Sequence, residues 1–221
     1  MDLTSLWLSF KLASITTVIL LIIGMPLAKW LAFSNHKMVP FINSIVVLPL
    51  VLPPTVLGFY LLSIMQNDSM LGSVFIKLTH SQLIFSFTGL VIASVVYSLP
   101  FVVQPMIATF NHIGSDTVKT AQTIGASKRT IFWKIILPLS KKGILSAGIL
   151  GFVHTLGEFG VVLMIGGNIP NQTRVVSIEI FNHVENLELQ QANQLSLILV
   201  ALSFAVIFWM NTNSKNKLVV S

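Results

Sequence analysis

Five long apolar runs dominate the sequence and decide what the chain can fold into. They cover residues 12–28, 38–67, 81–118, 143–157 and 189–214, and Asp116 is the only Asp, Glu, Lys or Arg within them. About 20 apolar residues in a helix cross the hydrocarbon core of a bilayer, so each run is long enough, or nearly so, to span a membrane. With 54% hydrophobic and 9% charged residues, the composition is typical of a membrane protein and excludes an ordinary water-soluble domain.

We therefore predict an all-α integral membrane protein whose residues 1–221 form one transmembrane domain. A polar cytoplasmic loop over about residues 112–140 joins the third span to the fourth. The amino terminus has no basic n-region and no small-residue cleavage site, so we expect the first span to be retained. The five spans are expected near residues 11–33, 43–65, 84–108, 142–165 and 192–210.

The basic residues predict the orientation in a cell membrane, because cytoplasmic loops carry an excess of Lys and Arg. With the amino terminus outside and the carboxyl terminus cytoplasmic, only Lys11, Lys77 and Arg174 lie outside. The cytoplasmic side then holds Lys29, Lys37, Lys119, Lys128, Arg129, Lys134, Lys141, Lys142, Lys215 and Lys217.

The net charge of +6 comes from residues spread among the loops, so it does not predict a nucleic-acid partner. The sequence has no phosphate-binding loop, and its histidines have no metal-ligand spacing. It also lacks the His-Glu-x-x-His and Gly-x-Ser-x-Gly patterns of hydrolases. We expect no enzyme activity, no catalytic residue, no cofactor and no metal. Energy for any transport must come from a partner or from an ion gradient.

The second span, LPLVLPPTVLGFYLL over residues 48–62, is rich in residues that break helices: Pro49, Pro53, Pro54 and Gly58. Broken helices persist at membrane depth where neighbouring helices, hydroxyl groups or a water-filled path satisfy the backbone. We expect this span inside the bundle, lining a pathway with neutral hydroxyl groups such as those of Thr55, Ser63 and Thr155. A proline kink that serves packing alone is the alternative.

The segment TAQTIGASKRTIFWKIILP, residues 120–138, predicts two short helices joined by a tight turn. Ser115 is the expected N-cap of a helix over residues 116–124, and Gly125 can take the left-handed conformation that ends it. Ser127 is the expected cap of an amphipathic helix over residues 128–137, with Pro138 as its exit. Small residues at 121, 125 and 126 favour close approach of a partner protein. An amphipathic helix lying on anionic lipid is the alternative.

This segment resembles the cytoplasmic coupling motif of permease subunits in ABC importers, in which two short helices sit in a cleft of the ATPase subunit. The residues that match the motif are Ala121, Gly125, Ala126, Phe132 and Pro138. Lys119 and Thr120 stand where the family has Glu and Ala, so the carboxylate of the motif is missing. The resemblance implies a type I ABC importer permease fold.

The second span and the stretch TLGEFGVVLMIGGNIPNQTR, residues 155–174, are similar to segments of molybdate-transport permeases, while sulfate permeases resemble the second stretch more. This resemblance implies a homodimeric pore in the lipid bilayer, two copies of a partner ATPase, and an extracytoplasmic molybdate-binding protein. The expected function is molybdate import driven by the ATPase. The alternatives are sulfate or tungstate import and, in a different class, a gradient-driven secondary carrier.

Glu158 is an ionisable residue at the end of a predicted span, which makes it a candidate functional residue. We expect a structural or gating role at the outer mouth, with its carboxyl group bonded to backbone amides or a neighbouring helix. A side chain that snorkels to the interface is the alternative. His154, one helical turn earlier, is a possible partner. Arg174 is expected to be an exposed surface charge, and contact with an anion or with an acidic patch on a binding protein is the alternative.

Overall fold

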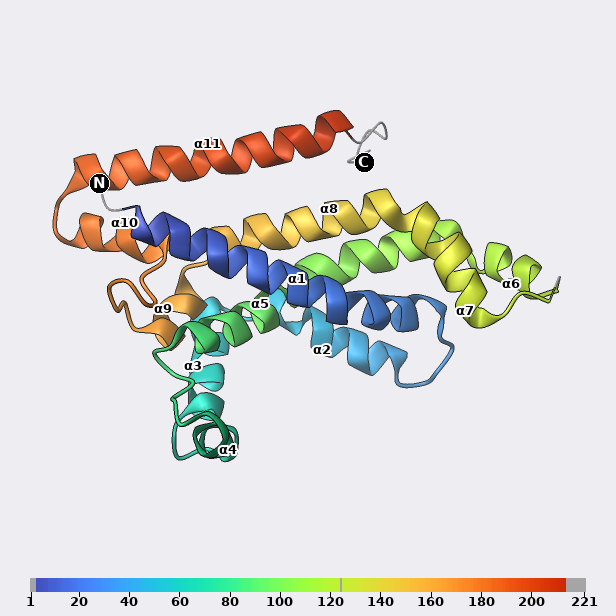
Figure 1. Cartoon of the computed structure of the whole chain (residues 1–221), viewed down its shortest axis with the longest axis horizontal. Helices are drawn as coiled ribbons and strands as arrows, with labels where there is room; N and C mark the ends of the chain where they lie inside the picture. The colour runs from blue at the N-terminus through green and yellow to red at the C-terminus, as the bar shows by residue number, and fades with distance from the viewer. Residues whose placement is uncertain (1–2, 124, 214–221) are drawn as a thin grey trace.

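The structure, a computed structural model, describes residues 3–123 and 125–213, and every regular element in these ranges is helical. Figure 1 shows an elongated bundle. In chain order the elements are α1 (Thr4–Phe33), α2 (Val39–Val51), α3 (Pro54–Met65), α4 (Met70–Thr79), α5 (Phe87–Ile113), α6 (Ser115–Thr123), α7 (Lys128–Ile131), the π-helical turn η1 (Phe132–Ile136), α8 (Leu137–Leu156), α9 (Gly160–Gly166), α10 (Val176–Glu185) and α11 (Leu189–Asn213).

Four helices in the described ranges are long and apolar enough to cross a membrane. They are α1, α5, the continuous helix Arg129–Leu156 and the segment Leu189–Met210 of α11. The pair α2 and α3, bent by 115° at its break, is also long and apolar enough when taken together, and it makes five spans if the pair counts as one. The prediction of an all-α membrane protein with about five spans is confirmed.

The centre of the bundle is formed by α1, α5 and α8, which pack on one another along most of their length. Their facing side chains make the main hydrophobic core, in which Leu20, Val102, Met106, Phe110 and Ala147 are fully buried. By contrast, α11 lies along the outside of the bundle, with most of its surface exposed (Figure 1). The bent pair also lies at the margin, where α2 packs on α5 and α3 packs on α9.

Two predicted boundaries are wrong. The fourth span does not continue to residue 165, because α8 ends at Leu156 and α9 starts as a separate helix at Gly160. Pro138 does not end the helix before it, since α7, η1 and α8 run on as one helix. The short helices α4 and α10 were not predicted. Ser69, whose hydroxyl accepts a 2.9 Å hydrogen bond from the Gly72 amide, was a readable N-cap signal for α4.

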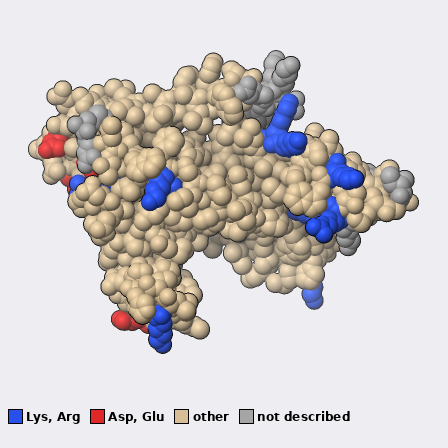
Figure 2. All heavy atoms as spheres, in the orientation of Figure 1, with Lys and Arg blue, Asp and Glu red and all other residues tan. Residues whose placement is uncertain are grey.

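The two ends of the long axis differ in structure and charge. Figure 1 places α6 and α7 at one end and α9 and α10 at the other, and in Figure 2 Lys and Arg gather over the first end. We call these the coupling end and the far end. The start of α1 lies at the far end, where the Ser9 hydroxyl accepts a 2.7 Å hydrogen bond from the Val176 amide of α10.

Candidate functional site

The turn between α6 and α7 has the geometry of a specific helix stop. Gly125 has φ +83°, its amide donates to the Gln122 carbonyl at 3.0 Å, and the Ala126 amide donates to the Ala121 carbonyl at 3.1 Å. These two bonds, with a glycine in the left-handed region, form the Schellman pattern that satisfies the last carbonyls of a helix. The predicted role of Gly125 in the turn is confirmed.

The second helix of the loop begins as predicted and then widens. The Ser127 hydroxyl accepts a 3.1 Å hydrogen bond from the Thr130 amide, which is the N-cap contact. In η1 the Leu137 amide donates to the Phe132 carbonyl, five residues back. Proline has no amide hydrogen and its ring collides with the preceding turn of an α-helix. The wide turn directly before Pro138 relieves this collision, so the helix continues into the membrane.

The wide turn also changes which side chains face inward. Ile131 and Ile136, five residues apart, are both buried, and Ala121 is buried in the same core cluster. The expectation that Ala121 faces a partner is therefore wrong for this structure, because its methyl group packs α6 on the bundle. Phe132 is partly buried, and the Lys29 ammonium group lies 4.0 Å from the centre of its ring. This cation–π contact joins the end of α1 to the coupling loop.

Gly125 stands on the outer surface of this loop with Arg129 and Trp133, all of them exposed. A Cβ atom added at Gly125 would have no atom within 4 Å. The side chains of Ser115, Asp116 and Lys128 lie outside the described residues. The described outer surface combines a basic and an aromatic side chain around an open turn, which suits a protein cleft and also a lipid interface.

The predicted break in the second span is present at Leu52 and Pro53, whose extended backbone (ψ 137° and 138°) separates α2 from α3. Each of these residues precedes a proline, and proline disfavours helical backbone at the residue before it. Pro49, in contrast, is buried within α2 without ending it. In this single chain the span lies at the margin of the bundle, with Thr55 exposed.

Close packing holds α3 against α9. A Cβ atom at Gly58 would come within 2.8 Å of the Met164 sulfur, so only glycine leaves room for that side chain in its present position. Beside this contact is an open cavity of about 600 Å³. It is lined from α3 by Pro54 and Thr55, from α5 by Tyr97, from the end of α8 by His154, and from the break after α8 by Glu158. The break therefore borders a cavity with polar groups on its wall.

One of these polar groups, the His154 side chain, is already paired, and so is the buried hydroxyl of the neighbouring Thr155. His154 Nδ1 shares a 2.9 Å hydrogen bond with the Ser98 hydroxyl, and its ring stacks on Phe101 with 3.6 Å between centroids. The predicted pairing of His154 with Glu158 is therefore wrong. Thr155 is also bonded to Ser98, at 2.8 Å, and donates to the Gly151 carbonyl at 2.9 Å. The sequence reasoning missed Ser98, because a lone serine in an apolar span carries no pattern.

Glu158 lies in the break between α8 and α9 and is only 4% exposed, which contradicts a side chain that snorkels to an interface. Its carboxyl group lies beside the buried Ser94 hydroxyl of α5. Neither carboxyl oxygen makes a hydrogen bond of standard geometry within the described residues, so the expected bonds to backbone amides are absent there. The Glu158 carbonyl accepts a 2.5 Å hydrogen bond from the Ser177 hydroxyl, which ties the break to α10.

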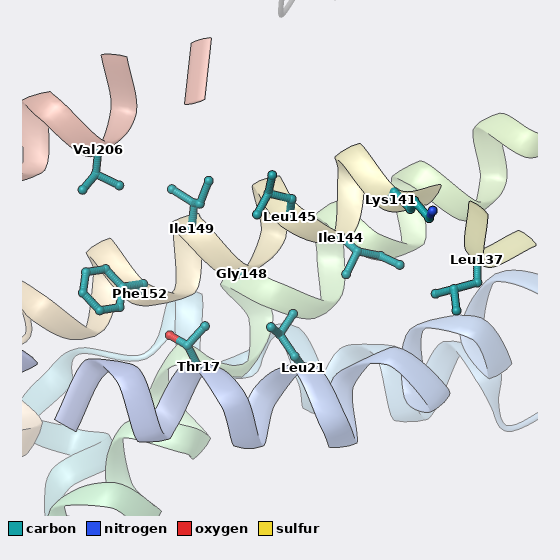
Figure 3. Close-up of a pocket in the computed structure, with 10 residues that line it drawn as sticks. All are labelled: Thr17, Leu21, Leu137, Lys141, Ile144, Leu145, Gly148, Ile149, Phe152 and Val206. Carbon is teal, nitrogen blue, oxygen red and sulfur yellow. The ribbon is translucent and has the colours of Figure 1, made fainter. Parts of the chain in front are cut away.

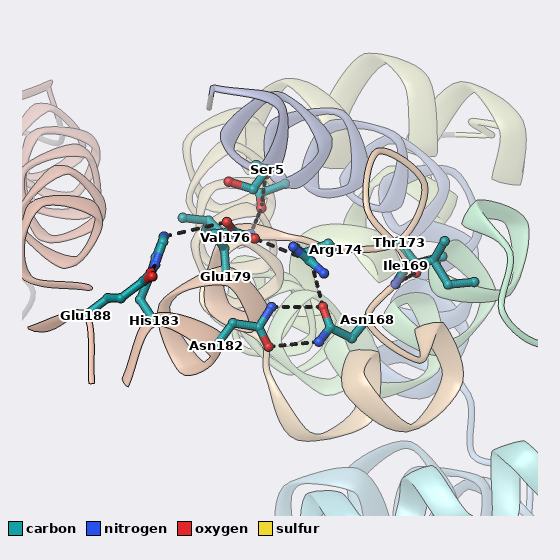
Figure 4. Close-up of polar contacts among 11 residues, drawn as sticks. Ser5, Asn168, Ile169, Thr173, Arg174, Val176, Glu179, Asn182, His183 and Glu188 are labelled. Carbon is teal, nitrogen blue, oxygen red and sulfur yellow. Dashed lines mark hydrogen bonds and ion pairs between the residues drawn. The ribbon is translucent and has the colours of Figure 1, made fainter. Parts of the chain in front are cut away.

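A polar cluster covers the far end between the loop after α9 and α10 (Figure 4). Arg174 Nε donates to Asn168 Oδ1 at 2.7 Å and lies 3.5 Å from Glu179. The amide groups of Asn168 and Asn182 bond each other at 2.8 and 3.0 Å. Arg174 is thus engaged within the chain and only partly exposed, which differs from the expected free surface charge. In the described residues no group of three or more His, Asp or Glu has an arrangement that fits a metal ion.

Comparison with known proteins identifies the family. The family described as binding-protein-dependent transport system inner membrane component matches residues 21–216. The molybdenum transport system permease protein ModB of Azotobacter vinelandii is 48% identical over 216 residues, which cover 98% of this chain and 96% of that protein. A probable sulfate transport system permease protein cysT of Zygnema circumcarinatum is 30% identical over 92% of this chain and 70% of its own length.

The fold has a solved counterpart. An inward-facing structure of the MetNI methionine ABC transporter contains a chain that aligns with a TM-score of 0.73 at 16% identity, covering 94% of this chain and 92% of that one. The family and the fold exclude the secondary-carrier alternative and agree with the expected transport role. The chain therefore belongs to the binding-protein-dependent transport system inner membrane components, the multi-pass permease subunits of ABC importers, which work with an ATPase and a substrate-binding protein.

Proposed function

We propose that this permease imports molybdate across the plasma membrane. The near full-length similarity to the molybdenum permease ModB is the observation that carries this proposal, since the sulfate permease is more distant. Two copies of the chain form the pore, two ATPase subunits drive it, and an extracytoplasmic molybdate-binding protein delivers the oxyanion. Discrimination among oxyanions rests mainly with that binding protein, and the pore offers only weak, passing contacts.

In this proposal the coupling loop receives the motion of the ATPase. Gly125 and Ala126 form the turn that enters the ATPase cleft, while Ala121 and Phe132 hold the two short helices to the bundle. The continuous helix from Arg129 to Leu156 carries the motion past Pro138 into the membrane. The Lys29 contact on Phe132 links the same loop to α1.

The other end of this continuous helix meets the proposed pathway. The helix α8 ends at the break that holds Glu158, and α9 beyond it packs on α3. A rigid-body movement of α8 relative to the other helices of the bundle would therefore displace α9 and α3 and change the shape of the cavity beside them. We assign the pathway and its gate to the broken span and to the end of α8 with the break after it: Pro49, Pro53, Pro54, Thr55, Gly58, Thr155 and Glu158. Of these residues, Pro54, Thr55 and Glu158 line the cavity.

A homodimer accounts for the exposed surface of the bent pair. Val51 is 76% exposed, and Phe59 and Tyr60 are exposed by 56% and 58%. On a membrane protein, exposed apolar and aromatic side chains face either lipid or another protein. A second copy packed on α2 and α3 would place two broken spans face to face, with the polar cavity between them.

The proposed orientation has the amino terminus outside and the carboxyl terminus in the cytoplasm. The coupling end carries most of the basic residues (Figure 2), as the positive-inside rule requires of the cytoplasmic side. Lys11, Lys77 and Arg174 belong to segments at the other end, on α1 near its start, on α4 and beside α10. The polar cluster of Arg174, Asn168 and Glu179 then faces the binding protein.

Competition between oxyanions tests the substrate. We expect cells that express the complete transporter to accumulate labelled molybdate, and unlabelled molybdate to suppress this uptake at lower concentration than sulfate does. Tungstate, which has the same charge and shape, serves as the second competitor. Preferred uptake of sulfate would contradict the assignment, and uptake that persists after deletion of the ATPase would contradict the transporter class.

Replacement of Glu158 tests its proposed gating role. We expect Glu158→Gln to keep uptake within about twofold, because an amide of the same shape fills the buried site without a charge. Glu158→Arg should abolish uptake, since it places an unpaired cation in the same buried position. Molybdate uptake is measured at equal amounts of membrane-inserted protein. An equal loss in both variants would show that an ionised carboxylate is required at this position.

A further inference from the structure

A long apolar groove lies between α1, α8 and α11, away from the cavity at the broken span. Its volume is about 440 Å³, and its walls include Leu21 of α1, Ile144, Leu145, Ile149 and Phe152 of α8, and Val206 of α11 (Figure 3). Because α11 is largely exposed and lies loosely over the bundle, the chain itself leaves this groove open. In a membrane, an apolar groove of this size is filled by an apolar molecule.

One end of the groove is charged. Lys141 is the single charged residue among the described side chains that line it, and Figure 3 shows Lys141 at one end with Phe152 and Val206 at the other. Lys141 belongs to the first turns of α8, beside the coupling end where the other basic residues gather. The occupant therefore combines an apolar body with an anionic group at one end.

The length of the groove matches one leaflet. Lys141 and Phe152 are eleven positions apart on α8, which at 1.5 Å per residue is roughly 16 Å. Half the hydrocarbon core of a bilayer is about 15 Å. A lipid whose headgroup meets Lys141 would therefore extend its acyl chain as far as Phe152, near the middle of the membrane.

A second copy of this chain fits the groove less well. It would bring apolar surface, but a partner for Lys141 requires a carboxylate at the coupling end. Of the seven Asp and Glu residues, only Asp116 falls between residues 112 and 140. An anionic lipid supplies both the chain and the charge, and basic side chains at the membrane surface attract such lipids.

We propose that this groove is a binding site for one phospholipid with an anionic headgroup, held by Lys141 and by the apolar faces of α1, α8 and α11. The lipid fills the space between α11 and the bundle. It stabilises α11 against the moving helix α8 while the transporter cycles. The site goes beyond the transport function and does not depend on which oxyanion is carried.

The neighbouring lysine provides a matched control. Lys142 is also exposed but does not line the groove. The complete transporter, with its ATPase, is purified in mild detergent from membranes that contain phosphatidylglycerol and phosphatidylcholine, and retained lipid is counted by native mass spectrometry. We expect the wild type and Lys142→Gln to retain phosphatidylglycerol in preference, and Lys141→Gln to retain about fivefold less, the usual effect of one basic residue at a membrane surface.

A second pair of variants tests the apolar part of the site without changing charge. Ile149→Trp places bulk in the groove, whereas Leu150→Trp places the same bulk at a side chain that does not line it. Only Ile149→Trp should lower lipid retention. No retained lipid in the wild type, equal retention of phosphatidylcholine, or equal losses in Lys141→Gln and Lys142→Gln would each overturn the proposal.

Discussion

Gly125→Asp is expected to abolish uptake while the protein remains in the membrane at its normal level. The position has φ +83° and open space around it, so a side chain meets no atom of the chain itself. The left-handed conformation costs an L-residue about 1–2 kcal/mol, and Asp tolerates it better than most. This cost is too small to unfold the chain, so the loss must arise where the new carboxylate meets the ATPase cleft.

Asn171→Asp is the matched control for this substitution. Asn171 is also exposed with a positive φ, of 60°, but it lies at the far end, in the loop before α10. The control places the same carboxylate in the same backbone conformation on the other side of the membrane. We expect it to keep uptake and ATP hydrolysis near those of the wild type. Normal uptake with Gly125→Asp would support a membrane scaffold or a lipid-facing loop instead of coupling.

Replacing both Pro53 and Pro54 with Ala is expected to lower uptake by about tenfold or more. A tenfold loss corresponds to a rise of about 1.4 kcal/mol in the activation free energy of transport. Each proline disfavours a helix interior by about 3 kcal/mol, so their removal lets α2 and α3 join into one helix. A joined helix loses the 115° bend and withdraws Thr55 and α3 from the cavity. Uptake of labelled molybdate, at equal expression, measures the effect.

Pro26→Ala provides the comparison. Pro26 is a proline inside α1, a helix that continues without a break across it. Its replacement removes a proline from a membrane helix but changes no bend between elements, and we expect uptake close to the wild type. If the double variant transports as well as Pro26→Ala, the break serves packing alone and is not part of the pathway.

Much of this architecture could be predicted from local patterns. The long apolar runs predicted the spans, because whether a helix can cross a membrane depends on its composition over about 20 residues. Gly125 and Ser127 predicted the coupling turn, because helix caps depend on a few neighbouring residues. The break before Pro53 and Pro54 was readable because proline acts on the residue before it.

The errors occur where distant segments meet. The sequence does not show that Ser98 lies beside His154, which is 56 positions away. Because His154 bonds Ser98, it does not pair with Glu158. Ala121 has the small side chain of a contact residue, yet the packing of α6 on the core buries it. The π-helical turn before Pro138 was also missed, because a proline after a helical pattern usually marks its end.

The most direct test of the account asks what touches the coupling turn. A photo-reactive amino acid is placed at Trp133, which is 58% exposed beside the turn, and in a separate variant at Leu187, which is 83% exposed at the far end. After illumination of membranes that hold the complete transporter, we expect the ATPase subunit to be cross-linked from position 133 and not from position 187. Cross-linking of the ATPase only from position 187, or of lipid alone from position 133, would contradict the account.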